Sequence, residues 1–357
     1  TASRDDSDAI EAEALTALAA GKVETEIERA GDVDAAFANA AMTADATYST
    51  DFVSHAQLEP QGVVISAATS AVEVWTSSQT PVFVTSNLVK LLDVTPGNIT
   101  VHQLRGGGGF GRRLSNEYIY EAALISRRVG TPVKLQWKRE DDMAFDYFRA
   151  PTYYRLQGAI SSDGQLTGWK NLVASASADG KTANYGAGYR PYDFPGKVIA
   201  NVAIEQSFVK SQTPTGAWRA PISNVYAFAE QSFIAELAHT AGQDHRDFLL
   251  NAIGDKGWIK EGDMASLNTA RARATIEAVT KAAGWGRTLP EGHGLGLAFF
   301  LSHSGHIAEV AEVSVEGKRI TVHDVWVAAD VGQVVNMSGL ENQLQGSVID
   351  GLSSMTA

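Results

Sequence analysis

The segment Arg105-Gly106-Gly107-Gly108-Gly109-Phe110-Gly111-Arg112-Arg113 decides how the rest of the chain is interpreted. A β-branched run at 99–104 precedes it, and a helical pattern at 116–129, stopped by Gly130, follows it. Four consecutive glycines between a strand and a helix let the backbone approach another group where any Cβ would collide, and their amides can face an anion or a carbonyl. The segment therefore predicts a ligand-binding loop, with a flexible structural turn as the open alternative.

The residues at the end of the glycine run exclude one class of ligand-binding loop. Gly111 is followed by Arg112-Arg113, whereas a phosphate-gripping loop ends in Lys-Ser or Lys-Thr. Phe110 lies inside the run, where an aromatic ring must either pack over a ligand or stay in solvent. The sequence thus excludes a phosphate loop of that type.

Strand and helix patterns alternate on both sides of this loop. We expect strands at 48–53, 63–67, 72–76, 99–104, 133–137, 154–160, 166–175, 199–208, 307–315 and 320–328. We expect helices at 7–21, 34–42, 80–91, 116–129, 224–241, 244–253, 270–283 and 340–354. The order around the loop is βαβ-like, and the mixture predicts an α+β (mixed α/β) fold in two or more lobes. The expected regions are a helical connecting segment at 1–45, a first subdomain with the Gly-rich loop at 46–210 and a second subdomain at 211–357.

Composition and charge exclude several classes of partner. The 357 residues are 44% hydrophobic, enough for a large core, and carry a net charge of -12 with a pI near 5.1. This charge repels phosphate backbones and anionic lipid, and the sequence has no run of about 18 apolar residues that could span a bilayer. Without cysteine, the chain holds no disulfide, zinc-thiolate site or iron–sulfur cluster of its own. We expect no nucleic-acid partner and no membrane span, and any redox relay must run through another chain.

Further motifs stand along the chain in an order that resembles one family. They are His55–Pro60, Trp75–Gln79, Thr131–Lys134, Arg139–Met143, Gly216–Pro221, Glu230–Ala238, Ala329–Gly332 with Asn336, and Gln343–Gly346. Together with the glycine run they resemble the large subunit of the molybdenum hydroxylase (xanthine dehydrogenase) family, especially isoquinoline 1-oxidoreductase beta subunits and aldehyde dehydrogenase molybdenum-binding subunits. The resemblance covers about 47–352. Met337 stands where the family has proline, and Gln345 where it has glutamate.

The resemblance implies a cofactor and a set of residues around it. The cofactor is a molybdopterin dinucleotide, in its cytosine form, whose dithiolene sulfurs hold the molybdenum, so the chain supplies no metal ligand. Gln79 is the implied catalytic residue, donating a hydrogen bond to an oxygen ligand of the metal. The implied cofactor-binding residues are Gly107, Gly108, Gly109, Phe110, Gly111, Arg219, Ala220 and Gln343. The implied substrate-pocket residues are Phe110, Trp218 and Pro221.

The same resemblance implies an oxidoreductase that needs partners. It would oxidise an aldehyde or an N-heteroaromatic substrate with water as the oxygen source, and electrons would leave through iron–sulfur clusters on a small subunit. The family's Gly-Val-Gly-Glu-Pro segment, which carries its catalytic glutamate, and its Met-Gly-Gln-Gly segment do not occur in this chain. We therefore expect the central portion of a large subunit, active only with other segments or chains. Because such relatives are often exported already folded, a periplasmic location is favoured over a cytoplasmic one.

Three of the site residues have simpler structural alternatives. Gln79 could cap the helix that starts at Thr80-Pro81, and Arg219 could be a surface ion-pair partner, since most arginines are exposed. Trp218 could be a core aromatic residue. These alternatives stay open at the level of sequence.

Other polar residues are expected to be structural. His303 and His306 suggest a metal site, but two histidines without a third ligand more often make hydrogen bonds. His55 and Glu59 are expected to be buried and paired. Asp141-Asp142 is expected to be a solvated turn.

Two other functions remain possible for the chain as a whole. A non-catalytic cofactor-binding or assembly module is compatible with the missing glutamate. A metal-independent hydrolase could use Thr1 or a serine as its nucleophile.

Overall fold

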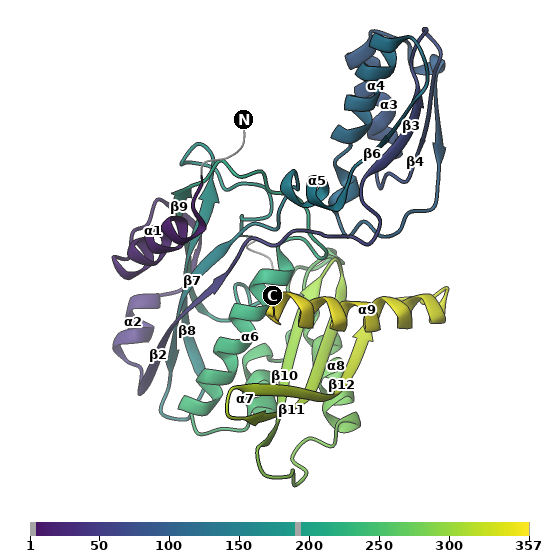
Figure 1. Ribbon diagram of the computed structural model, residues 1–357. Helices are drawn as coiled ribbons and strands as arrows, with labels where there is room; N and C mark the ends of the chain where they lie inside the picture. Colours follow the sequence, from purple (N-terminus) through teal and green to yellow (C-terminus); the bar gives the residue numbers. More distant parts are fainter. Residues whose placement is uncertain (1–4, 190–193, 357) are drawn as a thin grey trace.

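The computed structural model describes residues 5–189 and 194–356, so Thr1 lies outside the described residues. Within them, three sheets form: a five-stranded sheet of order β1-β9-β8-β7-β2, a four-stranded sheet of order β5-β4-β3-β6 and a three-stranded sheet of order β10-β11-β12. Figure 1 shows the four-stranded sheet and its helices as a small lobe that stands apart from the other two sheets. The expected α+β architecture with more than one lobe is confirmed.

The small lobe is a four-stranded sheet covered on one face by two helices. Its elements are β3 (Gly62–Ser66), β4 (Val72–Thr76), α3 (Pro81–Leu92), β5 (Ile99–Gln103), α4 (Glu117–Val129) and β6 (Val133–Gln136), with 3-10 turns at Pro96–Asn98 and Arg112–Leu114. β4 and β5 pair in parallel, which requires a crossover such as α3, so the expected βαβ order is confirmed. The helices bury Val84, Leu88 and Ile119 in the core of this lobe.

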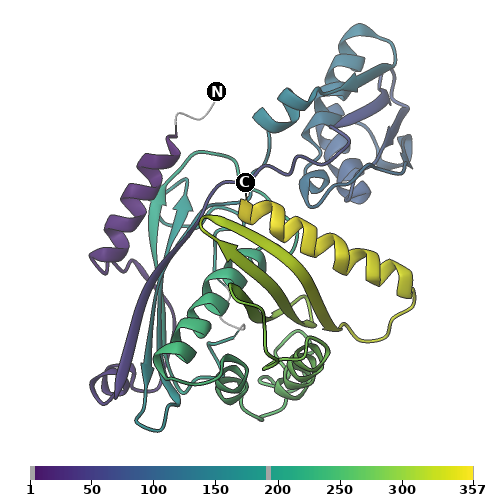
Figure 2. The same cartoon turned by 60° about the horizontal axis from the view of Figure 1, so that its bottom comes forward.

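The five-stranded sheet carries helices on both faces. Its strands are β1 (Thr25–Ala30), β2 (Met42–Thr50), β7 (Thr152–Ile160), β8 (Leu166–Ser177) and β9 (Asn201–Lys210). Neighbouring residues of β7 point to opposite faces: Tyr153 packs with α1 (Ser7–Ala19), and Tyr154 packs with α6 (Ser223–Thr240). Figure 2 shows α1, in purple, and α6, in green, on opposite sides of this sheet. The short α2 (Val33–Ala38) contacts β8 and β9.

The three-stranded sheet shares a core with the five-stranded one. It consists of β10 (His293–Ser302), β11 (Gly305–Glu316) and β12 (Arg319–Asp330), with α7 (His245–Ile253), α8 (Thr269–Ala282) and α9 (Met337–Thr356) around it. Trp169 of β8, Phe233 of α6 and Phe299 of β10 belong to one buried cluster. α9 runs along this sheet toward the junction with the small lobe (Figures 1 and 2). One core therefore holds α6, α7 and α8 against both sheets.

The small lobe is an insertion between two neighbouring strands. β2 and β7 are antiparallel partners in the large sheet, although the small lobe separates them in the sequence. The chain leaves β2 through residues 51–61 and returns to β7 through residues 137–151, and these two segments are called the neck below. Val53 and Arg149 form a backbone bridge at the base of the neck. Any ligand held by both lobes must therefore lie next to the neck.

Several elements differ from the expectation. β1 and β10 were not expected, nor was α5 (Arg139–Ala144), and the helix expected at 34–42 ends at Ala38 because β2 begins at Met42. β1 is an edge strand of mostly polar residues, held by backbone pairing with β9, so it lacks the apolar alternation of a strand. The 1–45 segment is thus not purely helical, and α1 is a packed helix rather than a connection. Within the described ranges, no helix combines the length and the apolar character needed to cross a membrane.

Candidate functional site

The inner side of the glycine loop is braced by two side chains. Gly107 donates its N–H to Oε2 of Glu59 at 2.6 Å, and Oε1 of Gln79 accepts from the N–H groups of Gly111, at 3.1 Å, and Arg113, at 3.2 Å. A Cβ added to Gly109 would lie 2.5 Å from Oε1 of Gln79. The space beside Gly109 is thus occupied by Gln79, and the hydrogen bonds of Glu59 and Gln79 hold the inner side of the loop.

The outer side of the same loop offers unused amide groups. Among the described residues, no acceptor is paired with the N–H groups of Gly108, Gly109 and Phe110. Gly108 has a φ of +93° and Phe110 a φ of +55°, so the backbone alternates in the manner of an anion-binding nest. Successive free N–H groups of this kind suit the oxygens of a polar ligand.

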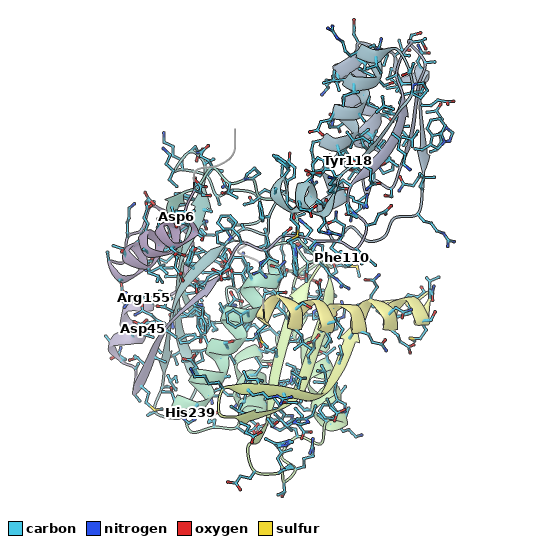
Figure 3. The ribbon with its side chains drawn as sticks, in the orientation of Figure 1. Asp6, Asp45, Phe110, Tyr118, Arg155 and His239 are labelled. Atoms are coloured by element: carbon cyan, nitrogen blue, oxygen red, sulfur yellow. The ribbon has the colours of Figure 1, made fainter. Side chains whose placement is uncertain are left out.

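The loop that bears Arg219 reaches the glycine loop across the junction of the lobes. A Cβ at Gly111, where φ is +109°, would overlap the backbone carbonyl oxygen of Ala217. The guanidinium carbon of Arg219 lies 5.9 Å from the centre of the Phe110 ring, within cation–π range. Figure 3 places Phe110 between the small lobe and α9. Two segments that are distant in the sequence thus meet at one place.

α9 completes this junction through Arg219. Nη2 of Arg219 donates to the backbone oxygen of Gln343 at 2.9 Å and to its Oε1 at 3.0 Å, and Nη1 lies 3.5 Å from Oδ2 of Asp350. The surface ion-pair alternative for Arg219 is therefore partly right, because an ion pair exists, but its partner is a helix of the same junction. Phe110, Arg219 and Gln343 are brought together as the sequence predicts.

Backbone strain is concentrated in the same region. Ala56 of the neck (φ +43°) and Ala220 and Ile222 of the Arg219 loop (φ +55° and +74°) all adopt left-handed conformations without being glycine. For β-branched Ile222 this is a rare conformation, which costs about 1–3 kcal/mol and persists only where surrounding contacts impose it. The Arg219 loop is thus held in a shape that its own residues do not favour.

His55 links the neck to the Arg219 loop. Its Nδ1 lies 3.0 Å from Oδ1 of Asp146, on the returning segment of the neck, and its Nε2 lies 2.9 Å from the backbone oxygen of Ala217. Burial alone would raise the pKa of Asp146, but the hydrogen bonds and the charge of His55 outweigh it and hold that pKa below its usual value. His55 is buried and paired, as expected.

The buried side chain of Arg112 pairs both with Asp146 and with Glu117, the first residue of α4. The side chain of Arg112 is fully buried, with Nε 2.9 Å from Oδ1 of Asp146 in an ion pair that lacks hydrogen-bond alignment. Its guanidinium lies between the rings of Trp137, at 5.5 Å, and Tyr147, at 5.4 Å, and it also pairs with Glu117. Both arginines after the glycine run are buried, although arginine is usually exposed.

Two of the structural alternatives for site residues are resolved by these contacts. Gln79 does not cap α3: the N-cap is Thr80, which makes no side-chain cap hydrogen bond, and the Gln79 oxygen is used by the glycine loop. Trp218 is only 8% exposed and packs under the guanidinium of Arg149, 5.4 Å away, while its Nε1–H has no partner among the described residues. Trp218 is thus a buried residue beneath the site, and Pro221 is half-buried beside it.

Other expected polar residues need correction. Asp142 is not solvated but buried, accepting from Nε2 of Gln57 at 2.9 Å and pairing with Arg139 at 3.1 Å. Glu59 is paired with Arg113 at 3.1 Å as expected, yet it is exposed rather than buried. Buried His306 accepts the N–H of Asn268 on Nε2 at 2.9 Å, and the described residues contain no group of three or more side chains that could hold a metal ion. Burial, with the charge of Arg271, lowers the pKa of His306 to about 4.

Comparison with known proteins gives two matches to family models. A model described as a molybdopterin cofactor-binding domain matches residues 17–251, and a second model with the same description matches residues 228–357. Together they cover the glycine loop, the neck, the Arg219 loop and α9.

Individual relatives agree with these models. The chain is 29% identical to isoquinoline 1-oxidoreductase subunit beta of Brevundimonas diminuta, covering 90% of this chain and 42% of that protein. It is 28% identical to membrane-bound aldehyde dehydrogenase [pyrroloquinoline-quinone] of Gluconacetobacter polyoxogenes, covering 90% and 44%. The crystal structure of quinoline 2-oxidoreductase from Pseudomonas putida 86 shares the fold, with a TM-score of 0.61 at 19% identity, over 80% of this chain and 40% of that one. The chain thus spans less than half the length of these relatives.

Proposed function

This chain belongs to the molybdopterin cofactor-binding family, and from that premise we propose that it is part of a molybdenum hydroxylase acting on an aldehyde or an N-heteroaromatic substrate. Water would supply the oxygen atom, and an iron–sulfur partner would receive the electrons. The names of the relatives, isoquinoline 1-oxidoreductase and aldehyde dehydrogenase, support both substrate classes. Because the chain spans less than half of these relatives, other segments or chains are needed for activity.

The meeting of the glycine loop and the Arg219 loop carries this proposal. The N–H groups of Gly108, Gly109 and Phe110, which have no acceptor in the part of the chain that the structure describes, and the guanidinium of Arg219 border one junction, as a polar, anionic cofactor requires. Trp218 directly precedes Arg219, and its buried Nε1–H has no acceptor within the described ranges. A buried donor without a partner is costly unless a ligand or water satisfies it. The residues present therefore fit the cofactor that the family binds.

In this proposal, a molybdopterin bound here, in its cytosine dinucleotide form, supplies the two-electron redox chemistry. The residues that hold it are Gly107, Gly108, Gly109, Phe110, Gly111, Arg219, Ala220 and Gln343. Arg219 provides a positive charge fixed in place by Gln343, so little ordering is needed when an anionic group binds. Gln343 thus acts through Arg219 as well as by its own amide.

The Oε1 atom of Gln79 is used in hydrogen bonds within the protein, and its Nε2 group is available to a ligand. Its Oε1 accepts from two amides of the glycine loop, which fixes the side-chain orientation and leaves Nε2 as the donor. We assign Nε2 the role of donating a hydrogen bond toward the bound cofactor at its reactive end. A donor fixed before the substrate arrives loses no energy in reorganisation, which is the basis of electrostatic catalysis.

The substrate wall would be formed by Phe110 and Pro221, with Trp218 behind them. Phe110 is 42% exposed and already rests on Arg219, so its ring can face both the solvent side and a planar substrate. Trp218 is buried and supports the loop from below. The iron–sulfur clusters belong to a partner, since the chain has no cysteine, and a periplasmic location is favoured.

The test of this proposal removes the central cation. Arg219→Ala should lower the pterin and molybdenum recovered with the purified complex by about tenfold, the effect of losing one charged hydrogen-bonding partner. Arg155→Ala is the matched control, because Arg155 is also partly buried and paired with a carboxylate, Asp45, far from Phe110 (Figure 3). If both variants retain the cofactor equally, Arg219 does not bind it and the proposed site is wrong.

A further inference from the structure

His55 stands where both loops and both segments of the neck converge. One ring nitrogen faces the carboxylate of Asp146, and the other faces the carbonyl oxygen of Ala217. His55 therefore bridges two oxygen atoms, in a place with almost no exposed side-chain surface.

The contacts of His55 run in both directions to residues next to the proposed cofactor contacts. On one side, Asp146 also pairs with Arg112, which directly follows Gly111 of the glycine loop. On the other side, Ala217 lies two residues before Arg219, and its carbonyl oxygen touches the position of Gly111. The backbone N–H of His55 itself donates to Asp146 at 2.6 Å. A continuous set of polar contacts therefore connects the two loops through one histidine.

We propose that His55, with Asp146, is a positioning residue that clasps the small lobe to the Arg219 loop and so sets the separation of the two cofactor-binding loops. The proposal rests on the proposed function for the identity of the ligand, but the clasp itself is a property of this chain. Within residues 5–189 and 194–356, the small lobe shares no sheet with the rest of the protein. A contact that fixes the neck therefore determines the position of the small lobe relative to the large lobe.

The charged groups around the clasp agree with this role. Asp146 receives Arg112 and His55 on the same oxygen, Oδ1, and Ser54 donates to its Oδ2 at 2.8 Å. A guanidinium, an imidazole ring, a hydroxyl group and the N–H of Tyr147, at 2.7 Å, thus surround a single buried carboxylate, while Glu117 pairs with Arg112 from α4. Removing one buried partner leaves its counterpart uncompensated, which makes the network cooperative.

Spin labels can measure the clasp directly. The chain has no native cysteine, so Lys90→Cys on α3 and His239→Cys on α6, both exposed, give one label on each lobe. In the purified complex, His55→Gln should broaden the interlobe distance distribution and speed the loss of pterin on dilution by about tenfold. Asp146→Asn keeps the shape of the side chain and removes its charge. It should also broaden the interlobe distance distribution and speed the loss of pterin, and it replaces His55→Gln in the test if that variant does not fold.

His306→Gln is the matched control for general loss of stability. His306 is also a buried histidine, but it contacts Asn268 in the large lobe and lies outside both loops. The clasp is supported if His55→Gln broadens the distance distribution while His306→Gln, at a similar melting temperature, does not. It is overturned if the distance distributions of the two variants both match that of the unsubstituted protein. Because the distance needs no cofactor, absence of pterin from every sample would refute the proposed function and still leave the clasp testable.

Discussion

Gly111→Ala is the substitution that most sharply probes the contact between the two loops. The added Cβ would overlap the carbonyl oxygen of Ala217, far inside the 3.0 Å that real Cβ atoms keep, so the loops must move apart. The φ of +109° adds a backbone cost of about 1–3 kcal/mol for a non-glycine residue, and overpacking adds about 1–3 kcal/mol. We expect a total loss of about 2–6 kcal/mol in the free energy of unfolding.

Gly130→Ala separates the two contributions. Gly130 follows α4 with a φ of +73°, but a Cβ there would have nothing within 4 Å. This variant should lose only the backbone part, about 1–2 kcal/mol. Urea unfolding of both variants, with the pterin content of each complex, gives the comparison. If Gly111→Ala is no less stable than Gly130→Ala and keeps its pterin, the two loops do not meet as described.

Three further substitutions test the site and its support. Gln79→Ala removes the Nε2 donor without adding a charge and leaves the Glu59 brace of the glycine loop, so pterin content should hold while turnover falls about 10²-fold; undiminished turnover would exclude Gln79 from catalysis. Ile222→Gly relieves the strain of the φ of +74° but removes a side chain that packs against the core and adds unfolded-state entropy, so the free energy of unfolding should fall by about 1–2 kcal/mol; an equal or higher stability in urea would show that the strain outweighs the packing. The pKa of His306 in the folded protein is about 4, below its ordinary 6.5. The contribution of neutral His306 to the free energy of unfolding is therefore fully present above about pH 6.5, and up to about 3 kcal/mol of it is lost as the pH drops toward 4. His306→Gln should flatten this pH dependence of stability, and an unchanged slope would contradict the assignment.

Local patterns in the sequence were sufficient for much of the small lobe. The glycine run, the helix start at Thr80-Pro81 and the stop at Gly130 each carry a backbone requirement that neighbouring residues reveal. β1 was missed because its stability comes from pairing with β9, an interaction that no periodicity within Thr25–Ala30 records. Helix and strand boundaries could thus be predicted where side chains determine them. They could not be predicted where pairing with a distant strand determines them.

The candidate site was predictable as a set of residues but not as an arrangement. The glycine run shows that no Cβ is tolerated, yet nothing in it shows that the excluded space belongs to Gln79 and to the backbone of Ala217. The contacts of His55 join residues 91 and 162 positions away, which only the folded neck brings together. The strain at Ile222 had no signal at all, because a β-branched residue in a loop suggests extended backbone.

The placement of the site explains why one chain carries motifs so far apart. The small lobe contributes the glycine loop and Gln79, the large lobe contributes Arg219, and α9 contributes Gln343. The two lobes have separate cores, so their relative position determines whether the loops can hold one ligand. The neck, with His55 and Asp146, is where that position is set.

Elemental analysis for molybdenum and iron, with pterin quantification and intact mass of every polypeptide in the purified complex, tests the central claim most directly. The account predicts molybdenum and pterin in equal amounts to this chain, together with iron and at least one further polypeptide. A stable, folded complex that contains this chain but neither molybdenum nor pterin would contradict it.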